Sequence, residues 1–315
     1  MSVPISYLTV ILIWTTTPLA IKWSAEGAGF VFAVSSRMLL GAVLGMSMAI
    51  LLRLEIPWHK SAVKTYLYAG LGIAISMMFV YWAAQYIPSG WISLIFGLSP
   101  IITGLLMYAL HGENEFSKDK LFGLFLGLSG LTVIFTTGLT LSSEAVLGIA
   151  AVLASTILYS FTAIKIKQYN DGIPALTITA AGLMFAAPFY GLCWYLMDGE
   201  IPDLVTSRAA ISILYLAIFG SVIGFALFFY ILKHVSASRV SLITLVTPVT
   251  ALFLGRFFNN EPLTMELLTG AIMILMGLVF YQFGINVRQQ RASPQLAVEM
   301  AIKNTNSKNT NRKCG

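Results

Sequence analysis

The sequence is poor in charge. Only 10% of its 315 residues are Asp, Glu, Lys or Arg, whereas 57% are hydrophobic, and the mean hydropathy is +0.83. An ordinary soluble domain carries about 25% charged residues, so this composition excludes one. The apolar residues instead form repeated blocks of about 20 residues, the length at which a helix crosses the core of a bilayer.

Cysteine and histidine are scarce as well. The two cysteines are Cys193, within an apolar block, and Cys314, near the last residue, so the chain has no disulfide framework. The three histidines, His59, His111 and His234, are scattered over loops and block ends, and neither HExxH nor GxSxG occurs. A membrane-embedded enzyme therefore fits poorly, and we expect no catalytic residues, no metal site and no cofactor.

What the sequence does contain is a series of ten apolar segments, which predict an all-α polytopic membrane protein with ten transmembrane helices. The segments cover residues 4–22, 30–52, 65–85, 90–110, 120–138, 146–166, 174–197, 210–232, 237–257 and 266–284. The first segment lacks a positive leading region and a convincing cleavage site, so we expect it to stay in the protein.

The placement of Lys and Arg predicts the orientation of these helices. Of the 19 basic residues, only Lys22, Arg208 and Arg256 fall in loops on one side, Arg37 falls within a segment, and the other fifteen fall in the opposite loops and the tail. Because cytoplasmic loops are rich in Lys and Arg, we expect both termini in the cytoplasm of a multi-pass protein.

The second half of the sequence repeats the first. WISLIFGLSPIITGLLMYALHGE, at residues 91–113, matches RVSLITLVTPVTALFLGRFFNNE, at residues 239–261, without a gap and at an offset of 148. The match aligns Pro100 with Pro248 and Glu113 with Glu261. The AIK ending at Lys22 recurs at Lys165, and Gly72 aligns with Gly220. A proline within such a segment bends the helix, which membrane proteins tolerate beside neighbouring helices or a cavity.

Each copy holds five segments, and five is an odd number, so the sequence predicts two inverted five-helix repeats. Inverted repeats are a recurrent design of secondary transporters, in which one half rocks against the other. We assign residues 1–140 to the first repeat and residues 141–286 to the second. Residues 287–315 form a basic tail whose Asn, Lys and Ser content predicts disorder in the cytoplasm, with either lipid attraction or orientation as its role.

These matched features resemble the two tandem copies of the EamA family, in the drug/metabolite transporter (DMT) superfamily. The resemblance rests on Trp14 with the AIK ending, Arg37 in RMLLGA, the two SLI, proline and glutamate sets, and the glycines of the fifth and tenth segments. It implies ten helices around a central cavity and the outward movement of small metabolites, often amino acids, across a bacterial inner membrane. Near the place of Arg37, the second copy has Ala180.

Polar and aromatic side chains within the segments are the candidates for lining such a cavity. Ser93, Phe96 and Pro100 share one helix face, as do Ser241, Thr244 and Pro248, although the hydroxyls could equally serve the bent backbone. Small-molecule sites combine apolar walls with a few polar groups, which Trp14, Tyr81, Tyr159 and Tyr230 could supply. Packing in the core or against lipid is the other role open to each aromatic.

The charged candidates are fewer. Arg37 falls about seven residues into its segment, where a charge is costly and is a functional candidate by default. It could bind a substrate carboxylate, or it could extend to the interface or hold loop carbonyls. All thirteen acidic residues lie in loops, at segment ends or in the tail. Glu113 and Glu261 are therefore coupling groups at the edges or structural residues, and we expect neutral, zwitterionic or anionic solutes rather than cations.

The sequence thus predicts a secondary transporter for an amino acid or a related solute, with export favoured over uptake. A membrane protein without transport activity is the remote alternative. Its partners are then a small-molecule substrate and membrane lipids, without nucleic acid. Three GxxxG pairs allow close helix approach within the bundle or between two copies, so a monomer and a homodimer both remain open.

Overall fold

The computed structural model describes residues 2–111, 118–136, 142–197, 199–234 and 242–283, and over these residues all regular structure is helical. The helices are α1 (Val3–Ala25), α2 (Phe30–Leu51), α3 (Lys60–Ala83), α4 (Ser89–Phe96), α5 (Ser99–His111), α6 (Lys118–Thr136), α7 (Ser143–Tyr169), α8 (Ala175–Met197), α9 (Ser207–Tyr215), the π-helix η1 (Leu216–Ile223), α10 (Gly224–His234), α12 (Leu242–Asn259) and α13 (Met265–Phe283).

Seven of the predicted membrane segments are long and apolar enough to cross a bilayer. They are α1, α2, α3, α7, α8, the pair α4 and α5, and the run from α9 through η1 into α10. Helices α6, α12 and α13 occupy the places of the other three predicted segments. Large apolar side chains such as Leu12, Phe125 and Ile211 are about two-thirds exposed, as lipid-facing side chains are. The prediction of an all-helical membrane protein is confirmed, while membrane crossing by those three helices stays a prediction.

The two matched prolines do not act alike, contrary to the prediction of a bend in both copies. Pro248 lies inside the continuous helix α12. In the first copy the segment is divided at Gly97 and Leu98, and Pro100 is the second residue of α5. A proline in the first turn of a helix removes no hydrogen bond, because that N–H has no partner within the helix. The first copy therefore has a broken helix where the second has an unbroken one.

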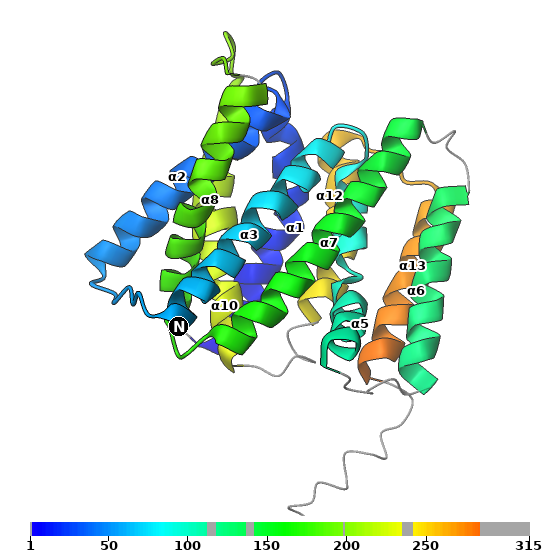
Figure 1. Cartoon of the computed structure of the whole chain (residues 1–315). Coiled ribbons are helices and arrows are strands. Elements are labelled where there is room, and N and C mark those ends of the chain that lie inside the picture. The colour runs from blue at the N-terminus through cyan, green and yellow to red at the C-terminus, as the bar shows by residue number, and fades with distance from the viewer. Residues whose placement is uncertain (1, 112–117, 137–141, 198, 235–241, 284–315) are drawn as a thin grey trace, which may run out of the picture.

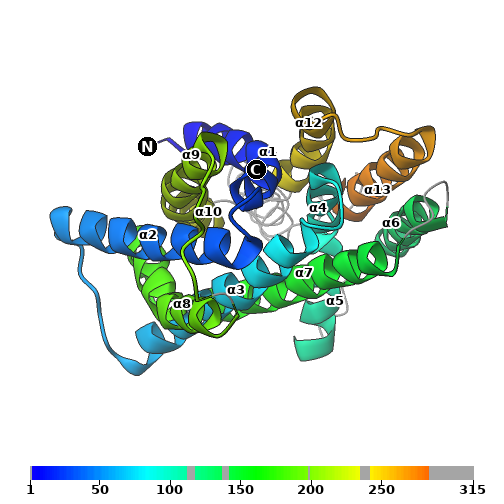
Figure 2. The same ribbon diagram turned by 90° about the horizontal axis from the view of Figure 1, so that it is seen from above.

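Matched helices of the two copies pack side by side and run antiparallel. Helices α6 and α13 lie together at one edge of the bundle, and α2 and α8 at the other (Figures 1 and 2). A Cβ on Gly123 would lie 2.5 Å from the carbonyl oxygen of Gly277, and one on Gly130 would lie 2.6 Å from that of Gly270. Residue numbers increase along α6 from Gly123 to Gly130, while those of their contacts in α13 decrease from Gly277 to Gly270, so the two helices run antiparallel. Glycine lets these backbones approach closely.

Helix pairs α2–α8 and α3–α7 repeat the antiparallel arrangement. Ser35 donates a hydrogen bond to the carbonyl of Tyr190 at 3.1 Å, while Gly45, further along α2, packs on Ala180, earlier in α8. Ser76 and Ser155 exchange hydrogen bonds with each other's carbonyls, at 3.1 and 2.9 Å. Helix α1 crosses between the halves and contacts α9, α10 and α12. The first described residues and the end of α13 both lie toward the lower end of the bundle as drawn in Figure 1, on opposite sides of it.

Candidate functional site

A cavity lies between the two copies. The space in it that the centre of a water molecule can occupy is about 110 Å³, and the 760 Å³ of empty space around that includes open solvent. Twelve lining residues come from the first copy: Trp14, Thr17, Pro18, Ile21, Arg37, Met77, Val80, Ile92, Ser93, Phe96, Gly97 and Ser99. Four come from the second: Tyr159, Gly220, Phe225 and Thr247. Neither copy could form this cavity alone.

One wall of the cavity is aromatic. The rings of Trp14 and Tyr159 both pack on Phe228, with centroids 5.0 and 6.0 Å apart. Phe96 meets Tyr159 edge to face at 6.3 Å. These rings come from α1, α10, α7 and α4, so tertiary packing brings them together. The geometry suits a flat or bulky apolar group, because ring pairs prefer tilted and edge contacts at such distances.

Arg37 supplies a positive charge at this cavity. Its residue is only 1% exposed, and its Nε donates a hydrogen bond of 2.9 Å to the Ser221 hydroxyl. A longer contact of 3.4 Å joins Nη1 to the Tyr81 hydroxyl. Ser221 belongs to the π-helix η1, a wide turn of the kind that is frequent at functional sites. Gly220, in the same turn, leaves room for the guanidinium, because a Cβ there would lie 2.9 Å from Nη2.

Three hydroxyls at the cavity differ in their hydrogen-bond partners. Thr17 and Thr247 donate to carbonyls of their own helices, at 2.7 Å to Ile13 and 3.0 Å to Ile243, as the backbone role anticipated for such residues requires. The Tyr159 hydroxyl is buried and has no hydrogen-bond partner among the described residues. A buried polar atom of this kind needs a partner such as water or a ligand.

The structure gathers some of the predicted site residues at the cavity and places others elsewhere. Trp14, Arg37, Ser93, Phe96 and Tyr159 line it. Two predicted tyrosines lie elsewhere: Tyr81 is buried and contacts Arg37, and Tyr230 packs in a separate cluster around Val10. Of the prolines, Pro100 is the second residue of α5, and Pro248 follows the lining residue Thr247 in α12. Ser241 and Glu113 lie outside the described residues, as does the side chain of Thr244. Binding by any of these residues stays a prediction.

Sequence reasoning missed several lining residues. Thr17, Pro18 and Ile21 follow Trp14 at helical steps of three, four and seven, so the face of α1 that carries Trp14 held the signal. Gly220 was visible in the sequence as the repeat match to Gly72 and as a member of a GxxxG pair, neither of which indicates a cavity. No local pattern indicated Met77, Val80 or Phe225, because apolar residues within an apolar helix look alike.

Glu261 lies at the centre of a polar network just beyond the cavity, where α1 ends. Its carboxylate is 7% exposed and accepts hydrogen bonds from the N–H and hydroxyl of Ser89, at 3.0 and 2.9 Å, and from the N–H of Gly90 at 3.4 Å. A carboxylate suits this place because the first N–H groups of a helix, here α4, lack partners within it. Glu261 thus fastens the second copy to a helix of the first.

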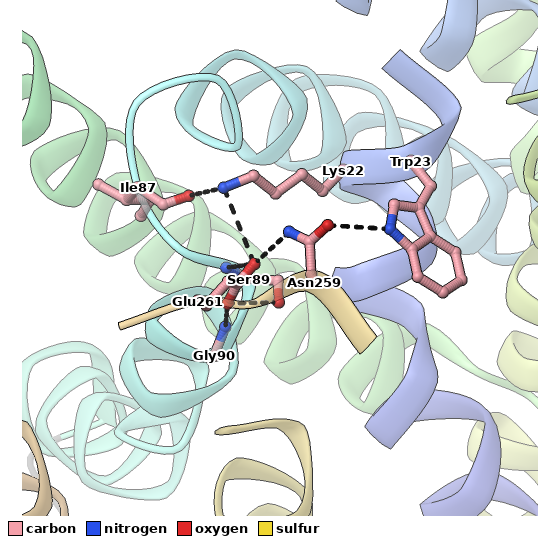
Figure 3. A network of polar contacts seen from close by, with 7 residues as sticks. All are labelled: Lys22, Trp23, Ile87, Ser89, Gly90, Asn259 and Glu261. Atoms are coloured by element: carbon pink, nitrogen blue, oxygen red, sulfur yellow. Dashed lines mark hydrogen bonds and ion pairs between the residues drawn. The ribbon is translucent and has the colours of Figure 1, made fainter. Parts of the chain in front are cut away.

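The same network reaches α1. Lys22 Nζ lies 3.8 Å from the Glu261 carboxylate and donates to the carbonyl of Ile87 at 3.3 Å. Asn259 donates to Glu261 at 3.0 Å and accepts from the Trp23 indole at 3.1 Å. Figure 3 shows these groups converging on the carboxylate. We call the seven residues drawn there the Lys22–Glu261 network; the others are Trp23, Ile87, Ser89, Gly90 and Asn259.

The part of the chain that the structure describes contains no group of three or more His, Cys, Asp or Glu residues that could hold a metal ion. The described lining of the cavity carries one charged side chain, that of Arg37, and is otherwise apolar or hydroxylic. Such a site can bind and release a solute. It offers no nucleophile and base pair for covalent chemistry.

Comparisons with known proteins place the chain among transporters. The model of the EamA-like transporter family matches residues 2–136 and again residues 146–282. An uncharacterized transporter of Archaeoglobus fulgidus is 26% identical over 84% of this chain and 93% of its own length. A probable amino-acid metabolite efflux pump of Escherichia coli is 27% identical over 70% of this chain and 77% of its own length.

The fold also matches a solved crystal structure. The two superpose with a TM-score of 0.64, over 93% of this chain and 99% of the other, at 19% sequence identity. At that identity the likeness concerns the fold alone.

Proposed function

The chain belongs to the EamA-like transporter family, and we propose that it is a secondary transporter that moves a small metabolite across a bacterial inner membrane by alternating access. The solute is an amino acid or a related neutral, zwitterionic or anionic compound. The observation that carries this proposal is the cavity, because residues of both copies line it and a shift of one copy against the other changes its walls.

The packing of matched helices supports an inverted relation between the copies. Helices α6 and α13 occupy equivalent places in the two copies and run antiparallel, as do α2 and α8. Two halves of opposite orientation can exchange conformations, so that a cavity open to one face becomes a cavity open to the other.

The Lys22–Glu261 network is the element that would hold one face closed. It joins the end of α1, the start of α4 and the end of α12. Lys22 directly follows the lining residue Ile21, and Ser89 lies about one helical turn before the lining residue Ile92. The loops concerned are those with few Lys and Arg residues, so we place the network on the outer side and both termini in the cytoplasm. Opening outward would require Glu261 to leave α4.

Export is the direction we propose, in line with the name of the Escherichia coli relative, a probable amino-acid metabolite efflux pump. Alternating access is reversible, so solute gradients set the direction. The described cavity lining contains no carboxylate to carry a proton, and Glu261 at its edge is the coupling candidate that the structure describes. The described GxxxG glycines have neighbours inside the bundle, so they serve packing within one copy. For the oligomeric state we propose a monomer or a homodimer.

Two measurements test the proposal. Purified protein in proteoliposomes should show saturable solute flux above that of empty liposomes. Cells that lack the gene should retain the solute, measured as the ratio of intracellular to medium metabolites. A requirement for an externally supplied metabolite would indicate uptake instead, and the absence of flux for every solute that differs between the two cell lines would contradict transport.

A further inference from the structure

The guanidinium of Arg37 is a buried charge without a charged partner among the described residues. Its hydrogen-bond partners there are the hydroxyls of Ser221 and Tyr81, both neutral groups. A guanidinium has five N–H donors, so two contacts leave donors over. Removing a charge from water is costly unless a counter-charge or several hydrogen bonds replace the water. Arg37 is one of the residues that line the cavity, with 1% of its surface exposed.

The surroundings hold Arg37 in place rather than neutralise it. The Ser221 hydroxyl fixes Nε from the π-helix η1, and the Tyr81 ring lies 5.8 Å from the guanidinium carbon. The guanidinium packs directly on Gly220, because a Cβ there would lie 2.9 Å from Nη2. Because Nε is held by Ser221, the remaining donors are on Nη1 and Nη2, the pair through which a guanidinium can bind a carboxylate by two parallel hydrogen bonds.

The rest of the described lining has no negative charge. It consists of aromatic and aliphatic side chains with the hydroxyls of Thr17, Ser93, Ser99 and Tyr159 among them, besides Thr247. In an α-amino acid the ammonium and the carboxylate are attached to the same carbon. When Arg37 binds the carboxylate, the ammonium therefore also lies near the guanidinium, and like charges in a buried site repel each other.

We propose that the cavity selects amphipathic monocarboxylates, meaning solutes with one carboxylate and an apolar body of aromatic size, over the amino acids and amines that share that body. Arg37 binds the carboxylate, and the wall formed by Trp14, Phe96 and Tyr159 receives the apolar body. This inference rests on the proposed transport function and narrows its substrate class from the broader set of neutral, zwitterionic and anionic metabolites.

A matched set of four probes tests the charge preference. The probes are 3-phenylpropionate, phenylalanine, 3-phenylpropanamide and phenethylamine, which present an anion, a zwitterion, a neutral amide and a cation on one phenyl body. Binding to purified full-length protein in nanodiscs is measured by calorimetry, and flux is measured in proteoliposomes. We expect 3-phenylpropionate to bind at least about 10-fold more tightly than each of the others, since hydrogen bonds to charged groups contribute roughly 10- to 100-fold.

Variants separate binding by Arg37 from a structural role. Arg37→Met should abolish the preference for the anion while leaving weak binding of the amide, whereas Arg37→Lys should keep the preference with lower affinity. Thr269→Ala, which removes an exposed hydroxyl of α13 that donates to the Met265 carbonyl of its own helix, should change all four affinities by less than about 3-fold. Should Arg37→Met fail to fold, Ser221→Ala, which frees Nε, should weaken the anion more than the amide.

Several results would overturn the inference. They are equal or tighter binding of phenylalanine or the amide, an equal loss of all four affinities in the Arg37 variants, or no binding of 3-phenylpropionate to folded protein. In each of these cases flux of another solute would leave the transport proposal standing. Conversely, anion-selective binding without flux of any solute would support the assignment of Arg37 and contradict transport.

Discussion

The two copies share a scaffold but differ in chemistry at matched positions. Arg37 of α2 projects its charge to the cavity, whereas Ala180, near the matching place in α8, is fully buried against Gly45. The scaffold is duplicated because both halves must pack on each other in equivalent ways. On our proposal the binding chemistry needs no duplication, since one solute site between the halves requires only one anchor.

The ends of α1 and α7 differ in the same way. Lys22 contacts the Glu261 carboxylate and the Ile87 carbonyl, while its match Lys165 donates to Gln168, three residues further along its own helix. Glu113, the match of Glu261, lies outside the described residues. Among the described residues, therefore, Lys22 forms an ion pair with the other copy, whereas its match Lys165 bonds only within its own helix.

Placing a charge on the second copy should have the largest effect. Ala180→Arg would bury an unpaired guanidinium against Gly45, which costs about 3–5 kcal/mol or more. We expect loss of the monodisperse peak in detergent size-exclusion chromatography, with Ala180→Ser as the tolerated control. A well-folded Ala180→Arg protein that binds 3-phenylpropionate normally would show that the two positions are less different than we conclude.

Breaking the fastening at Glu261 should have the next largest effect. Glu261→Gln removes the charge that Lys22 and the start of α4 share, and we expect a loss of about 1–3 kcal/mol in the free energy of unfolding. Thermal unfolding measures this loss, and the flux rate should change with it. Glu266→Gln, in the first turn of α13, is the control. Equal unfolding temperatures for the two variants would remove the network from the account.

Crowding the guanidinium should have a moderate effect. Gly220→Ala places a Cβ where Nη2 of Arg37 now lies only 2.9 Å away, so the guanidinium must shift. We expect the affinity for 3-phenylpropionate to fall about 10-fold, the size of one weakened charged hydrogen bond. Gly191→Ala, which would meet no atom within 4 Å, should leave binding unchanged. Equal affinity of the two variants for 3-phenylpropionate would show that Arg37 does not bind its carboxylate in this position.

Substituting the matched lysines, Lys22 and Lys165, should have the smallest effects on the free energy of unfolding, and the two effects should differ. Lys22→Met leaves the buried Glu261 carboxylate without its cation and should cost about 1–2 kcal/mol. Lys165→Met removes a contact to an exposed glutamine and should cost less than about 0.5 kcal/mol. Chemical unfolding in detergent measures both, and the reverse order would contradict the asymmetry of the two ends.

Much of the fold could be predicted from the sequence because bilayer thickness, proline spacing and repeated residues are local or periodic signals. The membrane helices, the repeat and the candidacy of Arg37 came from such signals. The π-helix at Gly220 and the helix break at Gly97 did not, since both depend on packing against neighbouring helices. Tyr230 looked equivalent to Tyr159 in sequence, yet only the fold decides which helix face meets the cavity.

The contacts of Glu261 could not be predicted either. Its repeat match marked the position, but its partners Ser89 and Gly90 are some 170 residues away and belong to the other copy. Pairing across such a separation is set by how the two halves meet. Sequence spacing reports on neighbours along a helix, so it identified the residue and missed the contact.

We propose that the cavity opens alternately to the two faces of the membrane and that the Lys22–Glu261 network closes one of them. The test uses Thr17→Cys, which places a cysteine in the cavity lining, in a protein whose own cysteines are removed by Cys193→Ala and Cys314→Ser. Its reaction with a membrane-impermeant maleimide is measured in right-side-out and in inside-out vesicles, and it reports which face of the membrane the cavity is open to. We expect labelling from both faces, and faster labelling from the outer face when Glu261→Gln is added. Labelling from one face only, at a rate that this substitution does not change, would contradict the account.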